Sequence, residues 1–129
     1  VSKLQSKIAL STTEAEYIAL SQSLRDLTPM RRLLKEAGEG LGFDLSGPTS
    51  LHSTVFEDNN GAISLARSRK ISPRTKHIAI KYHHFRSSIG LEKGIVIEKI
   101  DTTKQKADIF TKGLSADLHQ TIRKLLMGW

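Results

Sequence analysis

The sequence predicts a single α/β domain. Two apolar patterns alternate along the chain: short apolar or β-branched runs that suit strands, and longer stretches of three- and four-residue spacing that suit helices. The predicted order is strand, helix, strand, helix, helix, strand, helix, helix, which is typical of the α/β class. At 129 residues the chain can bury one modest core, and we expect no second domain.

The first predicted strand, residues 7–10, ends at a Ser-Thr-Thr run that can cap a helix. Glu14 and Glu16 stand in the first turn of this helix, where the macrodipole favours negative charge. Pro29 interrupts the helical pattern, so we expect either a kink or a fresh start capped by Thr28. The apolar side of this helical stretch is predicted to comprise Tyr17, Ile18, Leu20, Leu24, Leu27, Met30, Leu33 and Leu34.

A glycine-rich loop is predicted over residues 38–48, and a strand over residues 51–56 follows it. This strand delivers Glu57 and Asp58 to its carboxyl end, the edge where ligands gather in open α/β sheets. An Asn-Asn-Gly run then turns the chain into a short helix. A basic, proline-containing loop is expected over residues 67–75.

The second half of the chain is predicted to hold one further strand and three helices. β-branched residues favour a strand over residues 95–100. The helices are expected over residues 78–89, 104–111 and 116–127, and the second of them carries Asp108. The last helix is expected to have on its apolar face Leu118, Ile122, Leu125 and Leu126.

Charge is unevenly distributed along the chain. Twenty Lys and Arg against thirteen Asp and Glu give a net charge of +7. No acidic residue occurs between Asp58 and Glu92. The basic residues in this interval are Arg67, Arg69, Lys70, Arg74, Lys76, Lys81 and Arg86. Such a segment suits a polyanionic partner, and charge alone favours a solvated basic face equally.

Other classes of protein and site are disfavoured by what the sequence lacks. No cysteine occurs, which excludes disulfides and thiolate metal sites. No apolar run approaches membrane-spanning length and no signal-like segment begins the chain, so we expect an intracellular protein without a membrane partner. His83 and His84 lack the spacing of a helical metal pair, which disfavours zinc. Val1, in place of Met, indicates a fragment or a processed product.

Four stretches, taken together and in order, resemble one known family. They read Q-S-K-I-A-L-S-T-T-E-A-E-Y-I-A-L, F-E-D-N-N-G-A-I-S-L-A, R-T-K-H-I-A-I-K-Y-H and A-D-I-F-T-K-G-L. The family is the ribonuclease H domain at the end of the polyprotein of copia-type retrotransposons. The resemblance implies an incomplete ribonuclease H-like fold over residues 1–129, a mixed sheet flanked by helices. It is expected to be truncated at its N-terminus, because the family's domain begins with two further strands, the first of which bears an Asp.

The resemblance also implies a site that cleaves the RNA strand of RNA–DNA hybrids. Glu16, Asp58 and Asp108 match three of the family's four catalytic, metal-binding carboxylates. Two Mg²⁺ or Mn²⁺ ions are expected in a complete site, one preparing the attacking water and the other stabilising the leaving oxygen. The implied nucleic-acid contacts are Thr13, Asn60, Arg74, Lys76 and His77. The last three match the family's R-T-K-H stretch, where a structural role is equally open.

Each of these carboxylates also has a simpler interpretation from the residues alone. Glu16 suits a solvated first-turn carboxylate, and Glu14 competes with it for the metal role. Asp58 suits a turn residue that bonds the backbone two positions on, and Asp108 suits an i, i+4 partner of Lys112. No histidine lies between residues 85 and 118, so the proton-relay histidine of many cellular ribonucleases H has no counterpart.

Because one of the four carboxylates is missing, we expect the isolated chain to bind metal weakly and to show little or no hydrolysis. Residues upstream in the parent polyprotein, such as a reverse transcriptase segment, or a second chain would complete the sheet. Alternatively, the strands predicted over residues 7–10 and 51–56 pair directly with each other in place of the two missing strands. One alternative function is a non-catalytic nucleic-acid-binding or interaction module. A protein scaffold without a nucleic-acid partner is less favoured, because the basic segment suits a polyanion. The family's setting implies a cytoplasmic virus-like particle or the nucleus.

Overall fold

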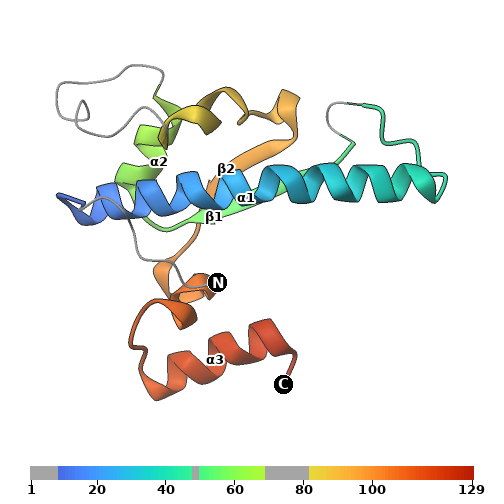
Figure 1. Cartoon of the computed structure of the whole chain (residues 1–129). Helices are drawn as coiled ribbons and strands as arrows, with labels where there is room; N and C mark the ends of the chain where they lie inside the picture. Colours follow the sequence, from blue (N-terminus) through green and yellow to red (C-terminus); the bar gives the residue numbers. More distant parts are fainter. Residues whose placement is uncertain (1–8, 48–49, 69–81) are drawn as a thin grey trace.

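The computed structural model of the chain describes residues 9–47, 50–68 and 82–129 (Figure 1). It is a mixed α/β structure, as the sequence predicts. Its helices and strands are α1 (Thr12–Gly40), β1 (Ser53–Glu57), α2 (Asn60–Arg67), β2 (Ile95–Lys99) and α3 (Ala116–Met127). Short 3₁₀ helices connect them: η3 (His84–Ser87), η4 (Leu91–Lys93), η5 (Thr102–Lys104) and η6 (Lys106–Phe110).

Helix α1 begins at a reciprocal cap. The Ser11 hydroxyl accepts a hydrogen bond from the Glu14 backbone N–H at 3.2 Å, and the Glu14 carboxylate accepts one from the Leu10 N–H at 2.9 Å. Together these bonds satisfy two backbone donors at the start of the chain's longest helix. The predicted cap within the Ser-Thr-Thr run is confirmed, and Ser11 is the capping residue.

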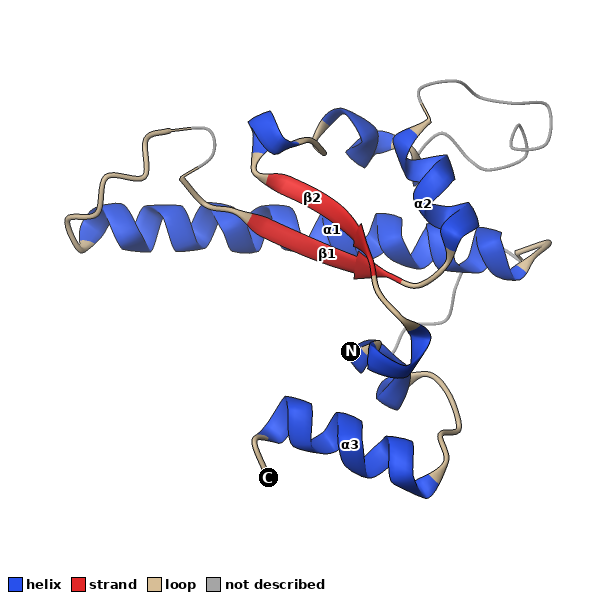
Figure 2. Ribbon diagram, turned by 180° about the vertical axis from the view of Figure 1, so that it is seen from behind, coloured by secondary structure: helices blue, strands red, loops and turns tan. Residues whose placement is uncertain are grey.

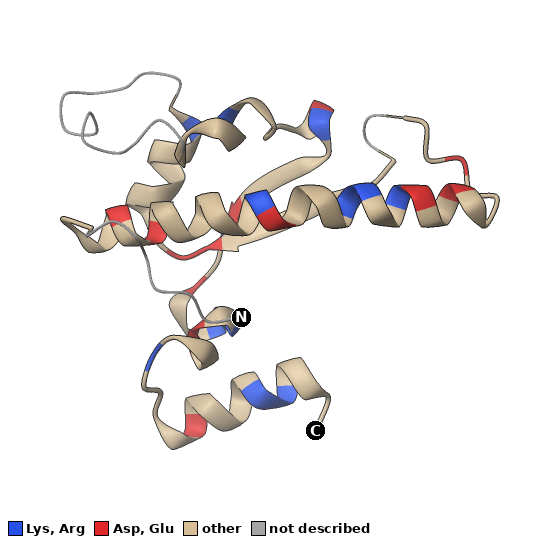
Figure 3. Ribbon diagram, in the orientation of Figure 1, with Lys and Arg blue, Asp and Glu red and all other residues tan. Residues whose placement is uncertain are grey.

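Helix α1 continues through Pro29 to Gly40 as one element (Figure 1). Of the two alternatives expected at Pro29, a kink or a fresh start capped by Thr28, the fresh start is therefore excluded. The Thr28 hydroxyl bonds the Leu24 carbonyl at 3.0 Å inside the helix. In the second half of α1, basic positions are followed by acidic ones toward the end of the helix (Figure 3). It forms the i, i+4 ion pairs Arg32–Glu36 at 2.9 Å and Lys35–Glu39 at 3.9 Å. Such exposed pairs each add only about 0.3–0.5 kcal/mol.

Strands β1 and β2 pair in parallel, in a register that runs from Ser53 opposite Ile95 to Glu57 opposite Lys99. The two strands lie along α1, as Figure 2 shows from behind. Both elements fall within the residues that the sequence predicts as strands, apart from Glu57 at the end of β1. Residues 9 and 10 of the expected first strand are not in a strand, and residues 7 and 8 lie outside the described ranges.

The core forms where the first half of α1 meets α2, β2 and the segment around η3. Its buried members are Tyr17, Ile18, Leu20, Leu24, Ala62, Ile63, Ala66, Tyr82, Phe85, Ile95 and Ile97. The Tyr17 hydroxyl lies 2.6 Å from His83 Nδ1 and accepts a hydrogen bond from Arg86 Nε at 3.0 Å. Tyr17 thus gives both apolar contact and polar anchorage to the segment that precedes β2.

Several residues predicted on apolar faces are exposed. On α1 these are Met30, Leu33 and Leu34. The reason is geometric: the two described strands are five residues long and cover only part of a 29-residue helix. Contact between α1 and the strands reaches Arg31, whose guanidinium donates to the Ser53 hydroxyl at 2.6 Å and to the Gly94 carbonyl at 2.8 Å, where both strands begin.

The C-terminal segment lies apart from the sheet and consists of η5, η6 and α3 (Figure 1). Helix α3 has the predicted bounds, and its Ile122 is fully buried, but Leu125 and Leu126 are exposed, contrary to expectation. The helix expected over residues 104–111 is replaced by the two 3₁₀ helices. Of the helix expected over residues 78–89, only residues 82–89 are described, and they contain η3.

The loop expected over residues 38–48 begins later, because α1 extends to Gly40. Of the basic loop expected over residues 67–75, residues 69–75 lie outside the described ranges, while residue 67 still belongs to α2. Across the described residues, every helix is too short or too polar to cross a membrane.

The core position of Leu24 generates a stability prediction. Leu24 is 2% exposed whereas Leu33, on the same helix, is 66% exposed. We expect Leu24→Ala to lower the free energy of unfolding by about 2–5 kcal/mol, because it leaves a cavity in the core. The matched change Leu33→Ala should cost less than about 0.5 kcal/mol. Urea denaturation followed by circular dichroism measures both, and equal losses would contradict this assignment of the core.

Candidate active site

Two segments far apart in the sequence bring three carboxylates together. Glu16 comes from the second turn of α1, and Glu57 and Asp58 come from the end of β1. One ligand oxygen from each can be chosen so that all three lie within 4.8 Å of one another. This spacing is compatible with three carboxylates that share one bound cation.

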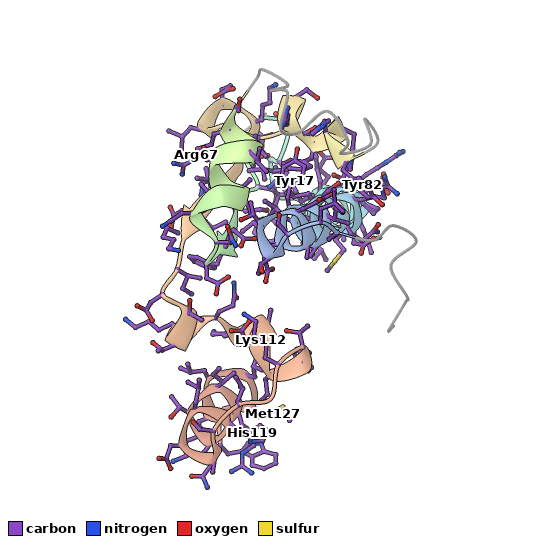
Figure 4. The ribbon with its side chains drawn as sticks, turned by 90° about the vertical axis from the view of Figure 1, so that its left-hand side faces the viewer. Tyr17, Arg67, Tyr82, Lys112, His119 and Met127 are labelled. Atoms are coloured by element: carbon purple, nitrogen blue, oxygen red, sulfur yellow. The ribbon has the colours of Figure 1, made fainter. Side chains whose placement is uncertain are left out.

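Asp108 joins this group through Lys112. The Lys112 ammonium nitrogen lies 3.0 Å from Asp108 Oδ1 and 3.9 Å from Asp58 Oδ2. Figure 4 shows Lys112 on the side of the C-terminal segment that faces the rest of the molecule. The structure therefore brings Glu16, Asp58 and Asp108 to one place, although they are separated by up to 92 positions, the difference between 16 and 108. The i, i+4 pairing of Asp108 with Lys112, the simpler interpretation, is also present.

The geometry separates Glu16 from its competitor Glu14. Glu14 is buried and turns back to cap α1. Two residues further, a helix has rotated by roughly 200°, so Glu16 leaves α1 on another side. That side faces the end of β1, where Glu57 and Asp58 stand.

The turn after β1 is held by its own side chains. Asn59 caps α2, its Oδ1 accepting the Ala62 N–H at 3.1 Å, and its own N–H donates to Glu57 Oε1 at 2.9 Å. Asn59, rather than Asp58, therefore provides the turn chemistry of the Asp-Asn-Asn-Gly run. Asp58 is instead directed toward Lys112.

The residues assigned to nucleic-acid contact fall into two groups. Thr13 lies between the helices, where its hydroxyl donates to Asn59 Oδ1 at 3.4 Å, and Asn60 is exposed at the first position of α2. Arg74, Lys76 and His77 lie outside the described residues.

Burial makes the acidic group electrostatically costly. It raises the pKa of Glu16, an effect that the Lys112 ammonium opposes and that the charges of Asp58 and Asp108 reinforce. Burial likewise raises the pKa of Glu57, against the stabilising hydrogen bond from the Asn59 N–H and with reinforcement from Glu16 and Asp58. Both carboxyls therefore hold their protons more tightly than in water.

Two lysines offset this negative charge. The hydrogen bond to Asp108 raises the pKa of Lys112, and the charges of Asp108, Asp58 and Glu16 act in the same direction against partial desolvation. Lys99, at the end of β2, donates to the backbone carbonyl of Asp58. The parallel register puts Lys99 directly opposite Glu57.

Glu57 belongs to this acidic group although the sequence motifs did not give it a metal-binding role. It is only 5% exposed and stands at the carboxyl end of the strand, beside Asp58. Its sequence signal is weak, because Glu57 is adjacent to Asp58 and strand alternation would direct the two side chains to opposite faces. Only the end of the strand at Glu57 allows both to reach Glu16.

The donor set is suited to a hard divalent cation. Every candidate ligand is a carboxylate oxygen, the kind of ligand that Mg²⁺ and Mn²⁺ prefer, and two of the carboxylates, Glu57 and Asp108, are buried. Within the described residues, Glu16, Glu57 and Asp58 form the group able to hold a metal ion, and Asp108 adjoins it through Lys112.

The sequence is similar to segments of curated plant transposon proteins. It is 33% identical over 128 residues to the retrovirus-related Pol polyprotein from transposon TNT 1-94 of Nicotiana tabacum, covering 97% of this chain and 9% of that protein. It is 35% identical over 114 residues to that from transposon RE2 of Arabidopsis thaliana, covering 88% of this chain and 7% of the relative. It is 33% identical over 119 residues to the retrovirus-related Pol polyprotein from transposon RE1 of the same plant, covering 92% of this chain and 8% of that protein.

These similarities support an origin of the chain in a retrotransposon Pol polyprotein. The chain spans less than a tenth of the length of each of these relatives. No protein-family model matches the sequence. No solved structure matches it either.

The raised pKa of Glu57 generates a prediction about pH. A carboxyl whose pKa lies above its ordinary 4.5 stabilises the fold while protonated, and this contribution is lost as pH rises through the folded-state pKa. In metal-free buffer, Glu57→Gln should therefore be more stable than wild type near neutral pH, and the difference should shrink toward about pH 4. Gln keeps an oxygen for the Asn59 N–H.

Urea denaturation at both pH values, with a chelator present, measures this difference. Glu98→Gln is the matched control, because Glu98 is exposed on the neighbouring strand. A Glu57→Gln protein that is less stable than wild type near neutral pH would show that the buried charge is compensated in the fold.

Proposed function

We propose that this chain forms part of a ribonuclease H-like domain that hydrolyses the RNA strand of RNA–DNA hybrids within a copia-type retrotransposon polyprotein. The observation that carries the proposal is the meeting of Glu16, Asp58 and Asp108 around Lys112. Three separate sequence motifs supply these carboxylates, and the similarity to Pol polyproteins of plant transposons supports the same origin.

Each residue has a defined task in this proposal. Glu16, Asp58 and Asp108 hold the metal ions, and buried Glu57 adds a further carboxylate beside Asp58. When bound, two Mg²⁺ or Mn²⁺ ions activate a water molecule and stabilise the charge that develops on the scissile phosphate and the leaving oxygen. The rigid elements α1 and β1 keep Glu16 and Asp58 at fixed positions, so little reorganisation is needed during reaction.

The fourth carboxylate of the complete site would come from strands upstream in the polyprotein. Strand β1 pairs with β2 along one edge, and its other edge has no strand partner within the described residues. Phe56 on β1 is also an exposed apolar side chain. Added strands would pair the free edge and cover apolar surface, which supports this source for the missing ligand.

A non-catalytic nucleic-acid-binding module is the second candidate function. It is favoured by the segment between Asp58 and Glu92, which contains no acidic residue and seven Lys and Arg residues. A fold that retains this basic segment could bind a polyanion without cleaving it.

Catalysis is tested by comparing the chain alone with the same chain extended by the upstream strands. We expect little or no Mg²⁺-dependent cleavage of a labelled RNA–DNA hybrid by the 129 residues, and cleavage by the extended protein. In the extended protein Asp58→Asn should lower cleavage by about 100-fold or more, because a neutral amide cannot stabilise the metal charge.

Asp117→Asn is the matched control, since Asp117 is exposed in the first turn of α3 and should leave cleavage unchanged. An extended protein that binds hybrid but never cleaves it would favour the non-catalytic function. Strong cleavage by the unextended chain, abolished by Asp58→Asn, would mean that Glu57 replaces the missing ligand.

Binding is tested by its dependence on salt. Affinity for a hybrid duplex should fall steeply between low and physiological salt, because each phosphate contact releases counterions. Changing Lys70, Arg74 and Lys76 together to Gln should flatten the slope of log affinity against log salt by about 0.9 for each phosphate that is no longer neutralised. Arg32→Gln with Lys35→Gln, on the second half of α1, is the control. A flat response in the wild type would contradict an electrostatic interface.

A further inference from the structure

Lys112 reaches into a group of carboxylates from two other parts of the fold. Its ammonium nitrogen contacts Asp108 at 3.0 Å and Asp58 at 3.9 Å. The side chains of Asp108 and Asp58 are 8% and 11% exposed, whereas that of Lys112 is 43% exposed. The lysine thus supplies positive charge to two desolvated carboxylates while its stem remains partly in solvent.

The backbone holds Lys112 in place but leaves its side chain free to turn away. The Lys112 N–H bonds the Asp108 carbonyl at 2.9 Å, and the Thr111 N–H bonds the same carbonyl at 3.1 Å. These bonds fix the start of the side chain one turn after Asp108. The four-carbon stem has several rotatable bonds, so the ammonium group can leave the carboxylates without any movement of the backbone.

We propose that Lys112 is the built-in counter-ion of the carboxylate site, and that a divalent cation displaces its ammonium group on binding between Asp58 and Asp108. This inference rests on the metal site of the proposed function. A divalent cation and an ammonium group repel each other and compete for the same oxygens, so both cannot lie between these two carboxylates. In the metal-free protein Lys112 limits the repulsion that the buried carboxylates would otherwise exert on one another.

A purely structural role makes the opposite prediction. If Lys112 were needed to align Asp58 with Asp108, its removal would separate the two carboxylates and weaken metal binding. If Lys112 is a displaceable counter-ion, its removal eliminates a competitor and strengthens metal binding. The sign of the change in metal affinity therefore distinguishes the two roles.

The test is Mn²⁺ binding to the full chain, followed by electron paramagnetic resonance of the free ion. Lys112→Met keeps the length of the stem and removes the charge, and we expect it to bind Mn²⁺ about tenfold more tightly than wild type. Lys112→Arg keeps the charge and should stay within about twofold of wild type. Lys106→Met removes the same charge from an exposed position at the start of η6 and is the matched control.

A second readout is the stability of the fold itself. Without metal, Lys112→Met should have a lower melting temperature than wild type, because the carboxylates lose their counter-ion. Added Mn²⁺ should raise the melting temperature of the variant more than that of wild type, in proportion to its tighter binding.

A third readout needs no substitution. In wild-type protein labelled with ¹³C at lysine Cε, the Lys112 signal should shift toward that of a solvent-exposed lysine as Mg²⁺ is added. This measurement applies even if Lys112→Met does not fold without metal.

The outcomes separate this inference from the proposed function. Equal or weaker Mn²⁺ binding by folded Lys112→Met, or a Lys112 signal that Mg²⁺ leaves unchanged while metal binds, overturns the counter-ion role and leaves the metal site standing. Failure of wild type and both Lys112 variants to bind Mn²⁺, in the 129-residue chain and in the chain extended by the upstream strands, overturns the metal site and this inference together. Tighter Mn²⁺ binding by Lys112→Met, without a similar gain in Lys112→Arg or Lys106→Met, supports both the metal site and the counter-ion role.

Discussion

The packing of the first half of α1 against α2 and the strands determines where the charged groups of the site lie. Tyr17 is wholly buried in this contact, and successive side chains of a helix are about 100° apart, so Glu16 must leave the helix beside the core. The close approach of α2 completes the arrangement. A Cβ on Gly61 would lie 2.6 Å from Thr13 Cγ2, so a glycine lets the start of α2 come this near to α1.

The same packing gathers negative charge where water is scarce. Glu57 and Asp108 are buried, and burial raises the pKa of both Glu16 and Glu57. A fold rarely keeps carboxylates in such surroundings unless a cation or hydrogen-bond donors accompany them. Here Lys112 and the Asn59 N–H do so, and Lys99 lies nearby on β2. The carboxylates are thus already close together in the positions that a divalent cation would need.

The site also lies where two parts of the molecule meet. Helix α3 packs on η6 and buries Ile122, while α1, α2 and the strands share the main core. Lys112 forms an ion pair with Asp58 at 3.9 Å, and the Gln105 side chain donates to the Phe56 carbonyl at 3.3 Å. Both contacts end beside the last residues of β1. The position of Asp108 relative to Asp58 therefore depends on polar contacts more than on apolar burial.

Local signals in the sequence were sufficient for some of the elements, but not for the helix expected over residues 104–111, which is replaced by 3₁₀ helices. The cap at Ser11, the strands around Val55 and Ile97 and the bounds of α3 depend on side chains within a few residues of each position. Motif order likewise singled out Glu16, Asp58 and Asp108. Periodicity could not say which apolar positions find a neighbour, so Met30 and Leu125 were expected in the wrong environment. Nor could a local signal decide between a kink and a fresh start at Pro29, and in the structure the helix continues through this residue.

Only the tertiary structure decided the roles that depend on distance through space. In the structure Glu14 caps α1, and Asn59 rather than Asp58 makes the hydrogen bond that caps α2. Glu57 also belongs to the acidic group. The tertiary structure also joined Lys112 to a carboxylate 54 positions away, the difference between 112 and 58, as well as to its helical neighbour. Sequence spacing determines which side chains share a helix or strand face, but the electrostatic energy of a charged group depends on every charge within several ångströms, whichever element carries it.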